Sequence, residues 1–291
     1  MRDVPDGLWR HLAEDAPELL YHYTSLGSFV EIVRSRSLYA TDILYLNDVL
    51  EYRHARQLIA NRIEERLSDP AEICERAALL WYLKMLNAAE TEPVYVASFS
   101  EKADDISQWR GYVPAGKGIC LGFDSAVLRE AAYSIGSAAT PAKRFGALGK
   151  VIYVSDDGGP SFDDFITSAC RYLDIIDGDV VRAVAGEGLV NHGAPFYKHS
   201  SFKDEAEWRV ILWARPGFPS PLEVDSRMGA STLVPFARLR FAPNGATFLK
   251  KVIIGPTPNM DLSVRATEGF LRSSGLETVS VTASQVPYRS W

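Results

Sequence analysis

The sequence predicts an α+β fold in which many short strands are interspersed irregularly with helices. Short runs of β-branched, aromatic and aliphatic residues recur along the 291-residue chain, with turn residues around them. Apolar residues at helical spacing separate some of these runs but not others, which argues against a regular doubly wound sheet. Strands are expected at residues 19–23, 38–40, 94–100, 119–123, 151–154, 207–213, 236–241, 252–254 and 278–282.

The helices follow from caps and apolar stripes. Thr24 or Ser25 can cap a helix directly after the first strand. Residues 50–89 carry two apolar stripes separated by Asp69-Pro70, which predicts a helical hairpin inserted as a layer or a lid. Residues 134–149, rich in Gly, Ala and Ser, predict an exposed loop. Further helices are expected at residues 104–112, 162–185 and 259–273.

The bulk composition indicates one domain over residues 1–291, with residues 50–89 as a helical insertion. The chain is 47% hydrophobic, so it can bury a core, and it has no repeat, low-complexity tract or linker. Its net charge of −6 gives no general affinity for nucleic acid. The first residues lack the apolar core of a signal peptide, and no run of about 20 apolar residues predicts a membrane span. A cytoplasmic protein is expected.

Metal and nucleotide motifs are missing from the sequence. Cys74, Cys120 and Cys170 form no C-x-x-C and are expected as buried free thiols. The histidines show no ligand spacing, so no metal site is expected. Phosphate-loop, Rossmann and serine-hydrolase signatures do not occur either.

His22 lies in the first predicted strand, between Tyr21 and Tyr23. Alternation sends the two tyrosines to one face of the strand, and His22 with Thr24 to the other. A lone histidine is more often a hydrogen-bonded structural residue than a functional one. A buried polar pair nevertheless requires local hydrogen bonds or a ligand.

Two later segments add polar groups. Ser98 and Ser100 end a strand, and Tyr112 closes a helix that follows; its ring can pack, cap the core or stack on a flat ligand. Asp204 and Glu205 are expected to be solvated charges of a turn before the strand at 207–213. Within that strand, Arg209 can hold a phosphate or pair with a carboxylate. A structural Glu–Arg pair is an equally good interpretation. The candidate cleft consists of His22, Ser98 or Ser100, Tyr112 and Glu207.

The motifs together resemble a bacterial family known by a domain-of-unknown-function label. The resemblance spans most of the chain and gives a family without an activity. Its motifs are Y-H-Y-T (21–24), L-N-D (46–48), S-F-S (98–100), S-Q-W-R-G-Y (107–112), I-C-L-G-F-D (119–124), F-K-D-E-A-E-W-R (202–209) and I-I-G-P (253–256).

A more distant resemblance is to ADP-ribosyltransferases of the His–Tyr–Glu type. It implies an ADP-ribosyltransferase-like core of short strands, with NAD as substrate. By this resemblance His22 holds a ribose, the Tyr23 backbone holds the nicotinamide amide, Tyr112 stacks on the nicotinamide, and Glu207 is the catalytic carboxylate. A fixed carboxylate offsets the positive charge that develops on the ribose. The implied NAD-contacting residues are His22, Tyr23, Thr24, Ser98, Ser100, Tyr112, Arg110 and Arg209.

The sequence also departs from that group. Ser98-x-Ser100 and Glu205-x-Glu207 look more like the Arg–Ser–Glu group, in which the first Glu steers the acceptor, yet no Arg replaces His22. Tyr23 or Tyr95 can take the place of Tyr112 as the stacking ring.

Three functions compete at this point. The first is NAD-dependent ADP-ribosyl transfer to a protein or nucleic acid, or NAD glycohydrolysis, as a toxin or phage-defence effector with an antitoxin or immunity partner. The second is nucleic-acid binding or processing, with Arg110 and Arg209 on phosphates and Trp109 and Trp208 stacking on bases. The third is a non-catalytic regulatory module on the same fold.

Overall fold

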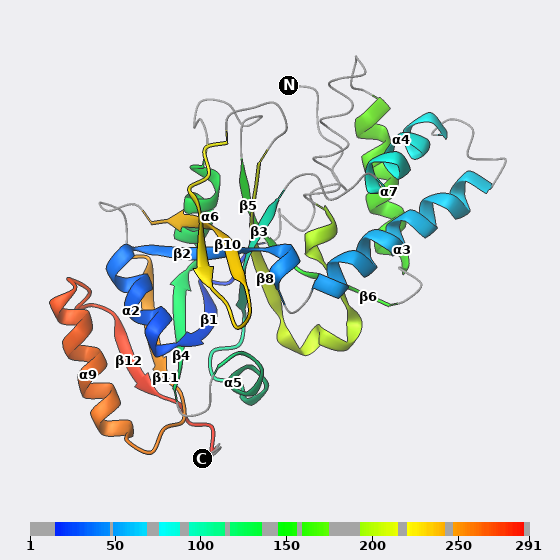
Figure 1. Ribbon diagram of the computed structural model, residues 1–291. Coiled ribbons are helices and arrows are strands. Elements are labelled where there is room, and N and C mark those ends of the chain that lie inside the picture. The colour runs from blue at the N-terminus through cyan, green and yellow to red at the C-terminus, as the bar shows by residue number, and fades with distance from the viewer. Residues whose placement is uncertain are drawn as a thin grey trace.

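The chain folds as a mixed α+β structure built on a mostly antiparallel sheet, as the sequence predicts (Figure 1). Among the described residues, no helix is both long and apolar enough to cross a membrane. The computed structural model describes residues 15–46, 49–68, 76–87, 93–113, 117–135, 145–155, 159–174, 193–214, 220–241 and 247–287.

Within the described part of the chain, ten strands form the main sheet, and β6 (Ile152–Val154) pairs with β7 (Tyr197–His199) in a separate two-stranded sheet. The expected loop at 134–149 is wrong at its end, because Gly146 begins a strand there. An added Cβ on Gly146 would lie 2.5 Å from the carbonyl oxygen of Ala132, a residue of the helix Ser125–Tyr133, so the strand packs closely on this helix. The ten strands are β1 Leu19–Ser25, β2 Ser37–Asp42, β3 Val94–Ser100, β4 Gly118–Asp124, β5 Gly146–Lys150, β8 Glu207–Trp213, β9 Val224–Met228, β10 Leu233–Arg240, β11 Leu249–Ile254 and β12 Ser280–Ala283.

Strand β3 is the junction of the sheet. Along one edge it pairs with the whole of β8, which in turn pairs with β5. Along its other edge, Ser100 pairs with Tyr21 of β1, whereas Tyr95 and Val96 pair with β2. From there the sheet continues through β1 to β4, β11 and β12, and through β2 to β10 and β9. The strands that carry the polar motifs, β1, β3 and β8, are therefore neighbours.

Helices cover both faces of the sheet (Figure 1). Helix α2 begins after Ser25, whose hydroxyl accepts from the Ser28 N–H at 3.1 Å. On the opposite face, α3 and α4 pack together and share an apolar cluster with α7, β3, β5 and β8. The described helices of the segment 50–89 thus contribute side chains to the core. The helices are α2 Leu26–Ser35, α3 Val49–Ser68, α4 Arg76–Asn87, α5 Ile106–Tyr112, α6 Ser125–Tyr133, α7 Gly159–Asp174 and α9 Met260–Ser273.

Some expectations fall beyond the described residues. Asn47 and Asp48 of the L-N-D motif lie there, as do Cys74 and the end of the helix expected at 162–185. Cys120 and Cys170 are buried free thiols, as predicted.

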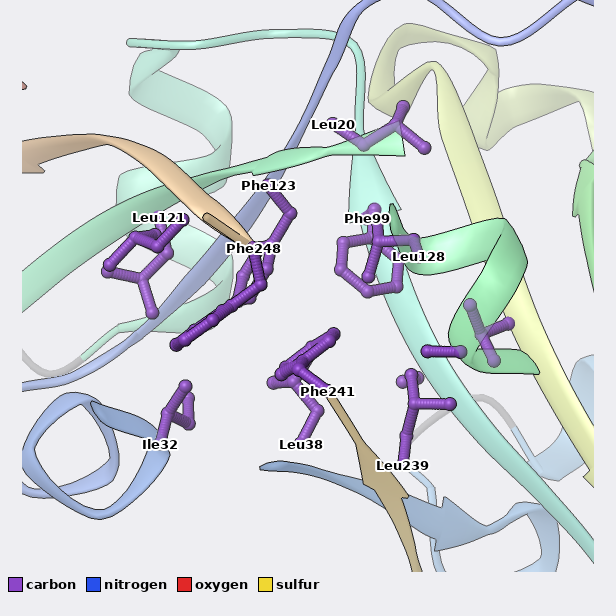
Figure 2. Close-up of a cluster of buried hydrophobic side chains, with 14 of the residues drawn as sticks. Leu20, Ile32, Leu38, Phe99, Leu121, Phe123, Leu128, Leu239, Phe241 and Phe248 are labelled. Atoms are coloured by element: carbon purple, nitrogen blue, oxygen red, sulfur yellow. The ribbon is translucent and has the colours of Figure 1, made fainter. Parts of the chain in front are cut away.

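An aromatic cluster holds the two branches of the sheet together. Phe123 comes from β4, Phe241 directly follows β10, and Phe248 directly precedes β11 (Figure 2). The rings of Phe241 and Phe248 stack with centroids 4.6 Å apart, and Phe123 lies 5.6 Å from Phe241. Because these rings join distant parts of the chain, their burial links the β4 branch to the β10 branch.

The I-I-G-P motif has a packing explanation. Gly255 N–H donates to the Gly118 carbonyl at 3.0 Å, and an added Cβ on Gly255 would lie 2.8 Å from that oxygen and 2.9 Å from the Trp109 ring.

We therefore expect Gly255→Ala to lower the free energy of unfolding by about 1–3 kcal/mol, measured by urea titration. Gly269→Ala is the matched control, since open space surrounds Gly269 in α9. Equal stability of the two variants would contradict the packing explanation.

Candidate functional site

Four buried or partly buried charges meet where β8 begins. We call Lys198, Glu205, Glu207 and Arg209 the charge cluster. Lys198 lies in β7, and its Nζ donates to Glu205 Oε2 at 2.8 Å and to Glu207 Oε2 at 3.1 Å. Glu205 ends a short 3₁₀ helix, and Ala206, with φ 46°, turns the chain into β8. The local turn therefore brings the two carboxylates to the same ammonium group.

Glu207 and Arg209 form a bidentate pair inside the protein. Arg209 donates to Glu207 Oε1 from Nε at 2.7 Å and to Oε2 from Nη2 at 3.1 Å. Arg209 Nη1 also donates to the Pro195 carbonyl at 2.6 Å. The pair is possible because residues two apart in a strand share a face. The expected structural Glu–Arg pair is present, and two acids balance two bases in the charge cluster.

The pKa shifts of Glu207 and Lys198 both favour the charged form. Burial by itself raises the pKa of Glu207, but Arg209 and Lys198 outweigh it and lower that pKa to about 2. Burial lowers the pKa of Lys198, but the neighbouring Glu207 and Tyr112 outweigh this effect and raise it overall. Opposite charges at these distances favour the charged form of each partner.

This pairing predicts acid-sensitive stability. A carboxyl group whose pKa falls on folding stabilises the native state above its unfolded pKa, and this contribution is lost as the pH falls through the folded pKa. For Glu207 the pKa drops from 4.5 to about 2, so the loss is about 3 kcal/mol between pH 6 and pH 2. Urea titrations across this range check it. A Glu207→Gln variant should lose correspondingly less stability on acidification, and an equal loss would contradict the assignment.

Two aromatic rings lie at the solvent side of the cluster. Tyr112 is 45% exposed; partial burial raises the pKa of its hydroxyl, and the nearby Glu205 and Glu207 raise it further. The Phe202 ring is also exposed, with its centroid 4.8 Å from Lys198 Nζ. Tyr23 and Tyr95, the other stacking candidates, are buried. Of the three tyrosines, only Tyr112 therefore presents an open ring.

The two serines of β3 lie beside the start of β8. After Arg209 and Lys198, the Ser98 side chain also lowers the pKa of the Glu207 carboxylate. Ser100 Oγ donates to the Glu205 carbonyl at 2.6 Å and accepts from the Lys102 N–H at 3.1 Å. The S-x-S and E-x-E motifs thus meet across the β3–β8 pairing, in which Ser100 is opposite Glu207.

His22 lies away from the cluster. Its ring is 5.7 Å from that of Phe99, a core residue, and the pleat sends Phe99 and Ser100 to opposite faces. His22 and Glu207 therefore point to opposite faces of the sheet, and Thr24 shares the His22 face. His22 Nδ1 lies 2.9 Å from the Ser98 carbonyl. Because a carbonyl only accepts, Nδ1 carries the proton; burial lowers the pKa of the ring.

Tyr23 positions the helix that carries Tyr112. Its hydroxyl donates to the Lys102 carbonyl at 2.8 Å and accepts from the Asp105 N–H at 3.0 Å, and Asp105 caps α5. The Tyr23 ring meets Trp109 edge-on at 4.8 Å. These contacts fix the start of α5, so Tyr112 at its end reaches Glu205.

The residues proposed for nucleic-acid contact are mostly inside the protein. Trp109 and Trp208 are fully buried, and their indole N–H groups donate to Asp104 and Glu101. Arg209 is buried in the charge cluster, whereas Arg110 is exposed on α5. In this structure neither tryptophan presents an exposed ring face to a base.

Sequence reasoning missed two members of the site and misplaced a third. Lys198 stands in the run Phe196-Tyr197-Lys198, where a lysine beside aromatic residues signals a buried or stacked amine. Tyr153 was also missed; its hydroxyl accepts from the Glu207 N–H at 2.8 Å. Glu205 was expected in solvent, but its side chain is only 19% exposed and binds Lys198. No group of His, Cys, Asp and Glu that could hold a metal occurs among the described residues.

Comparison with known proteins finds one family model that matches part of the chain. Residues 108–210 match the model described as "Protein of unknown function (DUF2971)". No curated protein and no solved structure matches the chain. The matched segment begins in α5 and ends in β8, so it holds Tyr112 and all four residues of the charge cluster. Over residues 108–210 the match agrees with the predicted resemblance to a domain-of-unknown-function family, whereas Ser98, Ser100 and His22 lie outside the matched segment.

Proposed function

We propose that the charge cluster and Tyr112 form the catalytic centre of an NAD-dependent ADP-ribosyltransferase or NAD glycohydrolase. One observation carries the proposal: the S-x-S serines of β3 and the E-x-E glutamates at the start of β8 meet on paired strands, and the exposed ring of Tyr112 at the end of α5 lies beside them. The resemblance to ADP-ribosyltransferases expects these groups to act together. Their convergence from distant parts of the chain supports it.

The proposed reaction breaks the bond between nicotinamide and ribose. The electron pair of that bond leaves with the nicotinamide nitrogen, and positive charge develops on the ribose. Ionised Glu207 offsets this charge, and Tyr112 stacks on the nicotinamide ring. Water or a nucleophile of an acceptor then adds to the ribose carbon and loses its proton to solvent. A fixed charge in a site that excludes water is the usual source of such stabilisation.

A bound substrate must share the Glu207 carboxylate with Lys198 and Arg209, which both donate to it. Lys198 Nζ is already closer to Glu205, at 2.8 Å, than to Glu207, at 3.1 Å. We assign Glu205 the role of binding the Lys198 ammonium alone when substrate is present. Glu207 Oε2 is then free to accept from a ribose hydroxyl. Arg209 keeps the carboxylate oriented throughout. His22 supports the site indirectly, through its hydrogen bond to the Ser98 carbonyl. The Tyr23 backbone binds the nicotinamide amide, as the resemblance implies.

The test is nicotinamide release from NAD by the purified protein, with the thermal shift caused by millimolar NAD as a second readout. Release together with a raised melting temperature supports the proposal. No release and no shift contradict it. A shift without release would instead favour the non-catalytic module. Once release is seen, labelled NAD can identify a protein or nucleic-acid acceptor and any antitoxin partner.

A further inference from the structure

Strand β9 forms an open edge of the main sheet. Among the described residues it pairs with β10 alone, and all five of its residues, Val224–Met228, are exposed. An edge strand presents backbone N–H and C=O groups that can pair with another strand, and natural proteins usually block such edges.

The hydrogen-bond pattern shows which β9 residues face this edge. Arg238 N–H donates to the Glu223 carbonyl at 3.0 Å and Gly229 N–H to the Thr232 carbonyl at 2.9 Å, so the odd-numbered residues bond to β10. By alternation, the backbone groups of Val224, Ser226 and Met228 point outward. In agreement, Ser226 N–H donates to the Asp225 side chain at 2.7 Å instead of to β10.

One face of this edge is apolar. Val224 and Met228 share a face of the strand because the pleat alternates from one residue to the next, and the register places Leu233 beside Met228. All three side chains are exposed, with Met228 at 86%. Solvated apolar side chains grouped along an unpaired edge are typical of an interaction surface.

The sequence of β9 is complementary to itself in the antiparallel direction. Val224-Asp225-Ser226-Arg227-Met228 reads apolar, acidic, serine, basic, apolar. When two copies pair about Ser226, each Asp225 faces the Arg227 of the other copy and each Val224 faces Met228. Opposite charges and apolar pairs directly across strands are stabilising, whereas like charges are destabilising.

We propose that the chain forms a symmetric dimer through β9, with Ser226 on the two-fold axis. The outward backbone groups of Val224, Ser226 and Met228 then form the ladder between the two sheets. Asp225 and Arg227 fall in the pairs without backbone bonds, where side chains approach more closely. Within its own chain Asp225 accepts from Arg238 at 2.9 Å and from the Ser226 N–H at 2.7 Å, and its side chain is still 57% exposed to a partner chain.

Sedimentation velocity from micromolar to millimolar protein tests the dimer. Wild type is expected to shift from monomer to dimer as the concentration rises. Asp225→Arg places Arg opposite Arg, and Arg227→Asp places Asp opposite Asp, so each variant alone should remain monomeric. An equimolar mixture of the two should form a heterodimer with a dissociation constant within about tenfold of the wild-type value, because every cross-strand pair is again opposite in charge.

The mixture also controls for folding, since a misfolded variant could not restore the dimer. Glu223→Gln removes the ion pair to Arg240 without changing a residue that faces a charge across the axis, and it should leave the dimer intact. A wild type that stays monomeric throughout, variants that dimerise alone, or a mixture that does not associate would each overturn the proposal. None of these outcomes depends on NAD.

Discussion

Replacement of Glu207 by Gln is expected to slow nicotinamide release from NAD by about 10²–10³-fold, as the loss of one preorganised electrostatic group does in other enzymes. The glutamine side chain keeps the shape of the glutamate and its one carbonyl oxygen can still accept from Arg209, but its amide nitrogen only donates and the side chain carries no negative charge. The positive charge that develops on the ribose then has no partner at this position. Initial rates at saturating NAD measure the effect.

The interpretation requires that the variant is folded and binds NAD. The substitution leaves Lys198 and Arg209 with Glu205 as their remaining acid in the charge cluster, so the assay should run well below the melting temperature of the variant. The NAD-induced thermal shift should persist. Glu31→Gln, an exposed change in α2, should release nicotinamide at the wild-type rate. A Glu207→Gln variant that binds and turns over NAD normally would exclude this carboxylate as the catalytic group.

The strands that the sequence predicts best are those buried on both faces. In β8, every residue is buried, and the run E-W-R-V-I-L-W is apolar apart from the two residues that pair with each other. Strand β9 was not predicted, because V-D-S-R-M lacks an apolar face long enough to stand out. It forms a strand because it pairs with β10, which itself pairs with β2. Tertiary pairing thus overrides a weak local preference.

In the candidate site, too, the sequence predicts some contacts and misses others. The Glu207–Arg209 pair was foreseen because both residues lie on one face of one strand. Lys198 and Glu205 were not, since their contact depends on a turn at Ala206 and on the position of β7. His22 was grouped with Glu207 because both are polar residues in predicted strands. Which face each side chain occupies depends on the register between β1, β3 and β8, and the sequence does not contain that register.

Arg209→Met is expected to lower the free energy of unfolding by about 3–5 kcal/mol, because it leaves the buried Glu207 carboxylate without its bidentate partner. Lys198 remains near Glu207 but is shared with Glu205. The substitution also removes the donor to the Pro195 carbonyl. Urea titration at pH 7 measures the loss. Arg240→Met, which breaks a solvent-exposed pair with Glu223, is the matched control and should cost about 1 kcal/mol or less.

The double variant Arg209→Met with Glu207→Gln separates two explanations of this loss. If the cost of the single change comes from an uncompensated buried carboxylate, removal of that charge should recover part of it, and the double variant should be more stable than Arg209→Met alone. If the cost came only from lost side-chain packing, the two changes would add. Additive losses would therefore show that the guanidinium acts as a packed side chain and that its charge contributes little. Recovery would show instead that Arg209 is required because Glu207 is buried in its ionised form, which is also the form that the proposed reaction needs.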